Sequence, residues 1–295
     1  MGYLSPIPIG IADGMVYVLI ASGLALTFGT MRLANMAHGG FFMIGAYLLY
    51  TLSRVWSGGL FAVIGGMILA IGGTTILGLV AERVIYRRLY GRPQLSAMLG
   101  TFALMLAIQG GVGEIWGINP LSVNYPAIDN LRFVSFGGAN IPIYSFVIIG
   151  AGVLAMAILG LVLYKSRLGL YTRAIAMDRH MSSLLGIRTR TVFVVSFAIG
   201  CALAGLAGAL AVPQIQLDPT LGADYIILGF SLLLIGGLTS IRGALLAGLL
   251  IGIVEAYAAT DFPYLAGYAI YIVTIAVLLV RPRGIFGAAH EEIEI

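Results

Sequence analysis

Residues 142–164 read PIYSFVIIGAGVLAMAILGLVLY, an apolar run without a charged side chain, and this run decides the class of fold. A transmembrane helix needs roughly 20 consecutive apolar residues, whereas the strands of a membrane barrel alternate apolar and polar positions. The whole chain has the same character. Of its 295 residues, 60% are hydrophobic and only 9% are charged, with a mean hydropathy of +1.03. Soluble domains carry about 25% charged residues. We therefore predict an all-α, polytopic transmembrane helix bundle.

Apolar runs that end at charges or at Pro/Gly clusters predict nine spans, all within one transmembrane domain that covers residues 1–295. Two of the runs are short for a hydrocarbon core of about 30 Å. A bundle of eight spans, in which these two form one re-entrant pair, therefore stays open. The first ten residues, MGYLSPIPIG, lack the basic start of a signal peptide, so we expect them in the mature chain. The predicted spans are 11–30, 36–53, 60–82, 95–117, 142–164, 192–212, 223–238, 244–260 and 264–280.

The distribution of basic residues predicts how the bundle is oriented. Cytoplasmic loops of membrane proteins carry an excess of Lys and Arg. If residues 83–92 are cytoplasmic, the alternation of nine spans also places residues 165–190 inside, and only Arg54 and Arg132 lie outside. This predicts an external N-terminus and a cytoplasmic C-terminus. The net charge of +4 does not indicate nucleic acid as a partner, because the basic residues lie at the ends of spans.

Several kinds of site are excluded by composition. The chain has one lysine, Lys165, and Tyr164 precedes it, so the nucleotide-binding motif G-x-x-x-x-G-K-[ST] is absent. Three scattered histidines and a single cysteine, Cys201, make a metal site unexpected. We expect no catalytic residue, no metal and no cofactor bound by this chain, and no enzymatic activity of its own.

Two glycine-rich breaks interrupt the apolar spans. Residues 31–47, MRLANMAHGGFFMIGAY, fit either a capped cytoplasmic turn or a substrate pathway, because broken polar backbone at membrane depth must be buried in protein or line a cavity. Residues 236–255, GGLTSIRGALLAGLLIGIVE, form a second break in the other half of the chain. Paired breaks indicate a site near the membrane midplane in transporters built from repeats. The candidate pathway residues are Asn35, His38, Gly39, Gly40, Gly236, Gly237, Thr239 and Ser240.

The segment 165–191 is the main polar segment between two spans. Within it, RAIAMDRHMSSLLG (residues 173–186) has apolar side chains at helical spacing and a glycine as a stop signal. It predicts one short amphipathic helix, which either docks on a cytoplasmic partner or lies in the membrane interface. The candidate docking residues are Arg173, Ala174, Asp178 and Gly186.

Three isolated acidic residues complete the candidates. A charge within a span is costly and therefore a functional suspect. Asp13 and Glu114 lie near the outer ends of their spans, and we expect them to face water. Glu255 lies deeper and is the candidate that an ion-coupled secondary carrier would need.

Five blocks in order resemble the branched-chain amino acid permease subunits of bacterial ABC importers. The resemblance implies an inverted-repeat permease fold of eight to nine spans in the cytoplasmic (inner) membrane of a prokaryote. It also implies a homologous second permease subunit, two cytoplasmic ATPases that use ATP, and an external solute-binding protein. The segment Arg173–Gly186 would be the coupling helix that fits a groove of the ATPase. The blocks are MRLANMAHGGFFMIGAY, YKSRLGLYTRAIAMDRHMSSLLGI, FAIGCALAGLAGAL, GGLTSIRGALLAGLLIGIVE and LLVRPRGIFG.

The substrate is less closely defined than the architecture. The resemblance favours branched-chain or other hydrophobic and neutral amino acids, but similar permeases carry urea or short amides. An ion-coupled carrier and a structural membrane scaffold are the alternatives from other classes. Ser182-Ser183 departs from the family, which more usually has alanine there, so the details of docking stay open.

Overall fold

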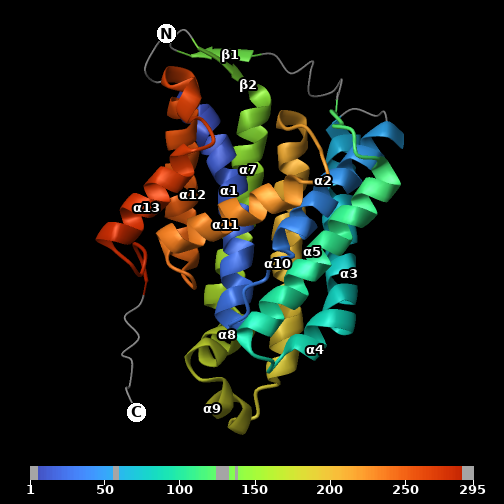
Figure 1. Cartoon of the computed structure of the whole chain (residues 1–295), viewed down its shortest axis with the longest axis vertical. Coiled ribbons are helices and arrows are strands. Elements are labelled where there is room, and N and C mark those ends of the chain that lie inside the picture. The colour runs from blue at the N-terminus through green and yellow to red at the C-terminus, as the bar shows by residue number, and fades with distance from the viewer. Residues whose placement is uncertain (1–5, 56–59, 124–132, 137–138, 288–295) are drawn as a thin grey trace.

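The computed structural model describes residues 6–55, 60–123, 133–136 and 139–287. It is an elongated bundle of helices, with a small hairpin at one end and two short helices at the other (Figure 1). The hairpin belongs to the segment predicted to lie outside, and the two short helices belong to the segment predicted to lie inside. Their opposite positions agree with that prediction, although the orientation itself stays a prediction. Arg132 lies outside the described residues.

The described helices follow the predicted spans closely. The first half contains α1 (Pro6–Met31), α2 (His38–Val55), α3 (Leu60–Ala81), a π-helical turn η1 (Glu82–Tyr86), α4 (Arg87–Leu89) and α5 (Gln94–Trp116). The antiparallel hairpin of β1 (Phe133–Phe136) and β2 (Ala139–Pro142) follows. The second half contains α7 (Ile143–Lys165), α8 (Arg167–Met177), α9 (Arg179–Leu184), α10 (Thr189–Ala211), η2 (Val212–Gln214), α11 (Leu221–Gly236), α12 (Ile241–Asp261), η3 (Pro263–Leu265) and α13 (Ala269–Val280).

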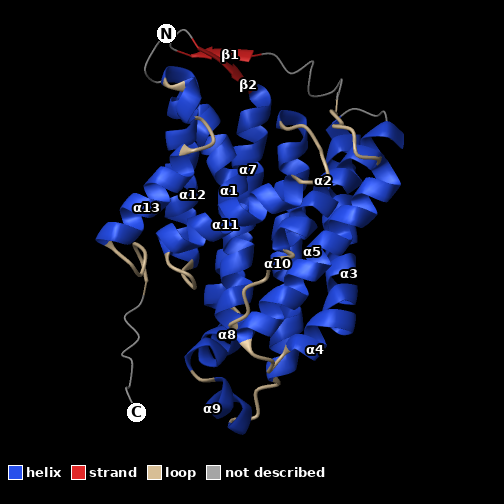
Figure 2. Cartoon of the chain, viewed as in Figure 1, coloured by secondary structure: helices blue, strands red, loops and turns tan. Residues whose placement is uncertain are grey.

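The all-α, polytopic class of fold is confirmed, but the number of full crossings stays open. Within the described residues, six helices are long and apolar enough to cross a membrane. The segment α12, predicted to be short, is one of them. By contrast α11 has 16 residues and α13 has 12, so each rises less than the roughly 30 Å of a hydrocarbon core. Figure 2 shows these helices as an almost continuous helical body joined by short loops.

Close glycine contacts hold the central helix α1 in place. Gly10 and Gly14 lie against Gly252 and Gly248 of α12, so close that an added Cβ would meet backbone atoms at 2.8–3.0 Å. In lipid, helices associate through van der Waals contact, and small residues allow their backbones to approach. The small residues of α12 therefore form a packing seam with α1 as its partner.

The start of α2 lies inside the bundle rather than at its surface. After α1 ends at Met31, the chain continues without helical structure through residues 32–37, and α2 begins where His38 lies beside Ile20, halfway along α1. Its first turn meets the first turn of α11, because a Cβ on Gly39 would lie 1.9 Å from the carbonyl oxygen of Gly222. Helices α2 and α11 thus begin next to one another in the interior.

Candidate translocation pathway and cytoplasmic coupling site

Asn35 organises the first break. It is 1% exposed, and its Oδ1 accepts hydrogen bonds from the backbone N–H of Ala37 at 3.1 Å and from the Tyr86 hydroxyl at 2.5 Å. Thr101 of α5 also holds the segment, since its Oγ1 accepts from the N–H of Met36 at 3.1 Å. The turn is capped by Asn35, as one interpretation expected. It is nevertheless buried in protein, which the other interpretation required.

Two buried polar atoms in this break lack a hydrogen-bond partner among the described residues. His38 is 0% exposed, and its Nε2 lies 3.2 Å from the carbonyl oxygen of Ile20, whereas its Nδ1 has no partner. The Nδ2 of Asn35 has none either. Buried polar atoms are nearly always hydrogen-bonded, so these two atoms are exceptions within the buried break. Gly40 packs against Ile108 of α5.

The second break is a tight turn between α11 and α12. Gly236 packs on the backbone of Gly243, and Gly237 has a φ of +104°, which favours glycine. Ser240 caps α12, because its Oγ accepts from the N–H of Gly243 at 3.0 Å. The chain after α13 braces the turn, since the N–H of Ile285 donates to the carbonyl oxygen of Ile235 at 2.8 Å. Ile285 belongs to the block LLVRPRGIFG, so this block packs against the second break.

The structure does not bring the two sets of candidate pathway residues together. Thr239 and Ser240 line a cavity of about 260 Å³ between α1, α7 and α8, with Gly29 and Arg173 also in its wall. Asn35, by contrast, accepts a hydrogen bond from Tyr86 and does not line that cavity. The cavity places the second break next to residues 165–191, here called the coupling segment, and the sequence did not predict this proximity.

The coupling segment forms two helices, so the prediction of a single helix over Arg173–Gly186 is wrong. Asp178 has an extended backbone (φ −146°) that ends α8, and its Oδ1 caps α9 by accepting from the N–H of Met181 at 2.9 Å. Aspartate is a favoured N-cap residue, and this was a readable signal for the break. The predicted stop is confirmed, because Gly186 follows α9 with a φ of +82°.

The outer face of this helix pair carries large exposed apolar side chains beside exposed polar ones. Met177 is 82% exposed, Leu184 68% and Leu185 75%, and Met181 is also exposed. Ala174 is only half-buried and lies on α8, away from α9. Arg173 instead ties α8 to the bundle, since its guanidinium donates to the carbonyl oxygen of Leu163. Exposed apolar side chains at the end of a molecule mark an interaction surface.

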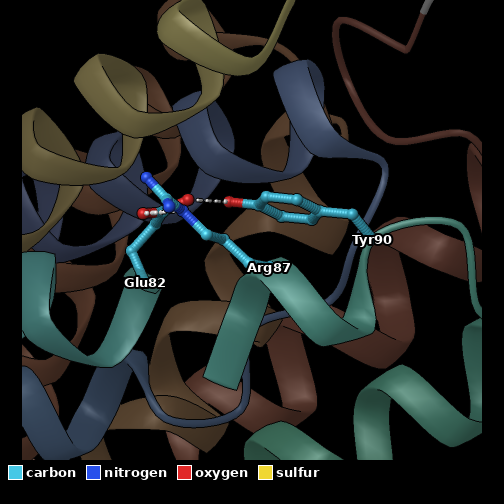
Figure 3. Close-up of polar contacts among 3 residues, drawn as sticks. All are labelled: Glu82, Arg87 and Tyr90. Carbon is cyan, nitrogen blue, oxygen red and sulfur yellow. Dashed lines mark hydrogen bonds and ion pairs between the residues drawn. The ribbon is translucent and has the colours of Figure 1, made fainter. Parts of the chain in front are cut away.

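A polar cluster missed from the sequence lies next to α9. Figure 3 shows Arg87 and Tyr90 converging on the carboxylate of Glu82: Arg87 Nε lies 3.3 Å from Oε2, and the Tyr90 hydroxyl donates to Oε1 at 3.2 Å. Burial, and then the adjacent Glu82 carboxylate, raises the pKa of the Tyr90 phenol, so it stays a donor. The rings of Tyr90 and Phe193 have centroids 5.3 Å apart, and the Arg179 guanidinium lies 4.8 Å from the centroid of Phe193. The cluster thus joins η1 and α4 to α10 and, through Phe193, to α9.

The isolated acids have different surroundings. Glu255 accepts hydrogen bonds from the N–H groups of Gly267 at 2.8 Å and Ile270 at 3.1 Å, so it caps the start of α13. Glu114 is exposed, as expected. Asp13 is half-buried and lines a cavity of about 330 Å³. No group of three or more His, Cys, Asp and Glu side chains in the described part of the chain could hold a metal ion.

The comparison with protein families decides the identity of the chain. Residues 7–280 match the sequence model of the family described as branched-chain amino acid transport system, permease component. The chain belongs to this family. The permease is 32% identical over 299 residues to the high-affinity branched-chain amino acid transport system permease protein BraD of Pseudomonas aeruginosa, covering 98% of this chain and 97% of that protein.

Other relatives agree. The corresponding permease protein LivH of Escherichia coli is also 32% identical, over 96% of this chain and 95% of its own length. The inner membrane ABC transporter permease protein YjfF of the same organism is 26% identical, over 84% of this chain and 71% of its own length. No solved structure matches the permease significantly. The chain is therefore a multi-pass membrane permease, as the five blocks predicted.

Proposed function

We propose that this permease is the membrane-spanning subunit of an ATP-driven importer for branched-chain or other hydrophobic and neutral amino acids. The names of BraD and LivH support the substrate class, and that of YjfF supports ATP-driven transport in an inner membrane. A homologous second permease subunit completes the pathway, two cytoplasmic ATPases hydrolyse ATP, and an external binding protein delivers the substrate. The N-terminus is external, the C-terminus is cytoplasmic, and the chain itself binds no cofactor.

The observation that carries this proposal is the outer face of α8 and α9, with its large exposed apolar side chains. Beside it lies a groove of about 520 Å³ lined by residues such as Tyr171, Leu185 and Arg188. Figure 2 shows α9 beyond the ends of the long helices, at the end of the bundle opposite the hairpin. A helix that rests in the membrane interface would turn such side chains toward lipid beside the bundle. An ATPase that covers this face explains the exposure better.

The contacts of α8 suggest how movement of the ATPases reaches the bundle. Arg32, just after α1, donates to the carbonyl oxygen of Ala176 at 3.1 Å, and Arg173 binds the end of α7. When the ATPases close on ATP, displacement of α8 and α9 therefore pulls on α1 and α7. We infer that this displacement alternates the access of the pathway between the two sides of the membrane.

An ion-coupled carrier has less support. It needs an acidic side chain that is free to exchange a cation, and Glu255 instead accepts two backbone hydrogen bonds at the start of α13. Urea or short amides stay alternatives to amino acids as substrates within the same mechanism.

The experiment measures uptake by cells that lack their own systems for these substrates. The permease is expressed with its neighbouring permease, ATPase and binding-protein genes, and labelled leucine, valine, alanine and urea are offered separately. We expect uptake of the amino acids that stops when either ATPase is omitted. Accumulation driven by a proton or sodium gradient in vesicles that contain this chain alone would overturn the proposal, and uptake of urea alone would correct the substrate.

A further inference from the structure

The outer half of α1 carries one acidic side chain, Asp13. It is the eighth residue of α1, which places it about 10 Å along the helix from Pro6. It lines a cavity of about 330 Å³ formed by α1, by the segment that follows α10, and by the first turns of α11. The lining residues are Ile9, Asp13, Val16, Tyr17, Ala211, Gln214, Ile215 and Tyr225.

The carboxylate of Asp13 lacks a partner in the part of the chain that the structure describes. No hydrogen bond or ion pair reaches it, and no basic side chain lines the cavity. A charged group at this depth is costly unless something compensates it. Elsewhere in the permease such groups are compensated: Glu82 pairs with Arg87, and Glu255 caps α13. An uncompensated carboxylate that lines a cavity therefore indicates a cationic ligand.

The other walls of the cavity define the kind of cation. The side chains of Tyr17 and Tyr225 line the cavity, and aromatic rings attract organic ammonium groups. Their hydroxyls and the Gln214 amide supply neutral donors, whereas Ile9 and Val16 form an apolar wall. A small metal ion would need several oxygen ligands at short distances. One carboxylate beside aromatic rings suits an organic ammonium better.

We propose that this cavity is the entry site of the permease for a zwitterionic amino acid, with the Asp13 carboxylate bound to the ammonium group of the substrate. The aliphatic side chain of the substrate lies against Ile9 and Val16, and its carboxylate accepts hydrogen bonds from Gln214 and a tyrosine hydroxyl. The volume is at the lower end of the range of ligand pockets, about 300–1,000 Å³, which suits a molecule of this size. The inference rests on the proposed function and names the subsite that selects the substrate.

The first arm of the test measures uptake in the complete importer. Asp13→Asn keeps the shape of the side chain but removes its charge, and we expect leucine uptake to fall at least tenfold. Assembly with the ATPases and their basal ATP hydrolysis should be unchanged, because the cavity lies at the end of the bundle opposite α8 and α9. Asp13→Glu should restore part of the uptake. Glu114→Gln is the matched control. This carboxylate is exposed on α5 and does not line the Asp13 cavity, so uptake should stay normal.

The second arm measures occupancy without transport. Gln214 is exposed at the cavity, so a cysteine in its place should react with a thiol reagent. The native Cys201 is 1% exposed, and its slow reaction in the unmodified chain gives the background labelling. We expect leucine to protect this cysteine in the purified complex. Isocaproate, which has the same carbon skeleton without the ammonium group, should not protect it. Adding Asp13→Asn should abolish the protection by leucine.

The two arms separate the two proposals. Equal protection by leucine and isocaproate, no protection by leucine, or protection that survives Asp13→Asn would each overturn the ammonium site, even if the wild-type importer transports leucine. Asp13→Asn with wild-type uptake would overturn it as well. Conversely, charge-dependent protection by leucine in a complex that transports no amino acid would support the ammonium site and reject the proposed function.

Discussion

Gly39→Ala tests the contact between the first turns of α2 and α11. The new Cβ would lie 1.9 Å from the carbonyl oxygen of Gly222 and 2.9 Å from the Cβ of Ile226. Ordinary van der Waals contact begins near 3.4 Å, so the two helices must separate along this direction. Overpacking typically costs about 1–3 kcal/mol, and here the obstacle is backbone, which cannot rotate away. Alanine recovers about 1 kcal/mol through its helix propensity.

We therefore expect a net loss of up to about 2 kcal/mol and a lower apparent melting temperature of the purified complex. Thermal unfolding at one fixed scan rate measures it, because membrane complexes often unfold irreversibly. Gly110→Ala on α5 is the control: it is also helical, but an added Cβ there meets no atom within 4 Å, so it should be neutral or stabilising. If both variants melt at the same temperature, α2 and α11 are not packed as described.

Four further changes give separate readouts. Leu184→Glu puts a charge on the apolar face of α9 and should abolish co-purification of the ATPases while the permease still inserts; retained ATPases would reject docking there. Ser240→Ala removes the cap of α12 and should cost about 0.5–2 kcal/mol in thermal unfolding, whereas lost uptake at unchanged stability would place Ser240 in the pathway instead. Glu255→Gln keeps an acceptor for α13 and should preserve uptake, which an ion-coupled carrier would lose. Tyr86→Phe leaves the buried Asn35 amide with one donor fewer and should lower stability by about 1–3 kcal/mol in the same unfolding assay.

Hydropathy predicted the positions of the helices because each span is a local run of apolar residues. It could not predict depth: the break at Asn35 looks the same in sequence whether it lies in the cytoplasm or inside the bundle. The burial of this break follows from contacts with Tyr86 and Thr101, which are far away in the chain. The division of the coupling segment at Asp178 is a local effect that capping preferences could have predicted.

The candidate site illustrates the same limit. Asp13 and Glu114 are equivalent in sequence, since each is an isolated acid near the outer end of a span. The cavity that distinguishes them depends on how Gln214 and Tyr225 fold back over α1. The cluster around Glu82 was likewise hidden, because the π-helical turn that shapes it has no signature in hydropathy.

The π-helical turn η1 also sets the phase of α3 against α10. In an α-helix, four residues turn through about 400°, so a row of contacts spaced by four drifts by about 40° at each step and soon leaves its partner. A π-turn has a wider i→i+5 hydrogen-bonding pattern and takes more residues for one revolution, which reverses the drift. The π-helical turn lies directly after α3, where a continued α-helix would turn its contact residues away from α10. The contacts with α10 along α3 and the turns that follow it are Thr74 with Gly205, Gly78 with Cys201, Tyr86 with Phe197, and Tyr90 with Phe193.

These contacts hold α3, η1 and the end of α4 against α10 on both sides of the π-helical turn. If the same five residues, Glu82–Tyr86, were ordinary α-helix, everything after them would be rotated by about 100°, the turn of one residue. Tyr90 would then lose its contact with Phe193, whereas the contacts of α3 before the π-helical turn would remain. The π-helical turn accommodates one extra residue and therefore keeps the residues on both of its sides facing α10.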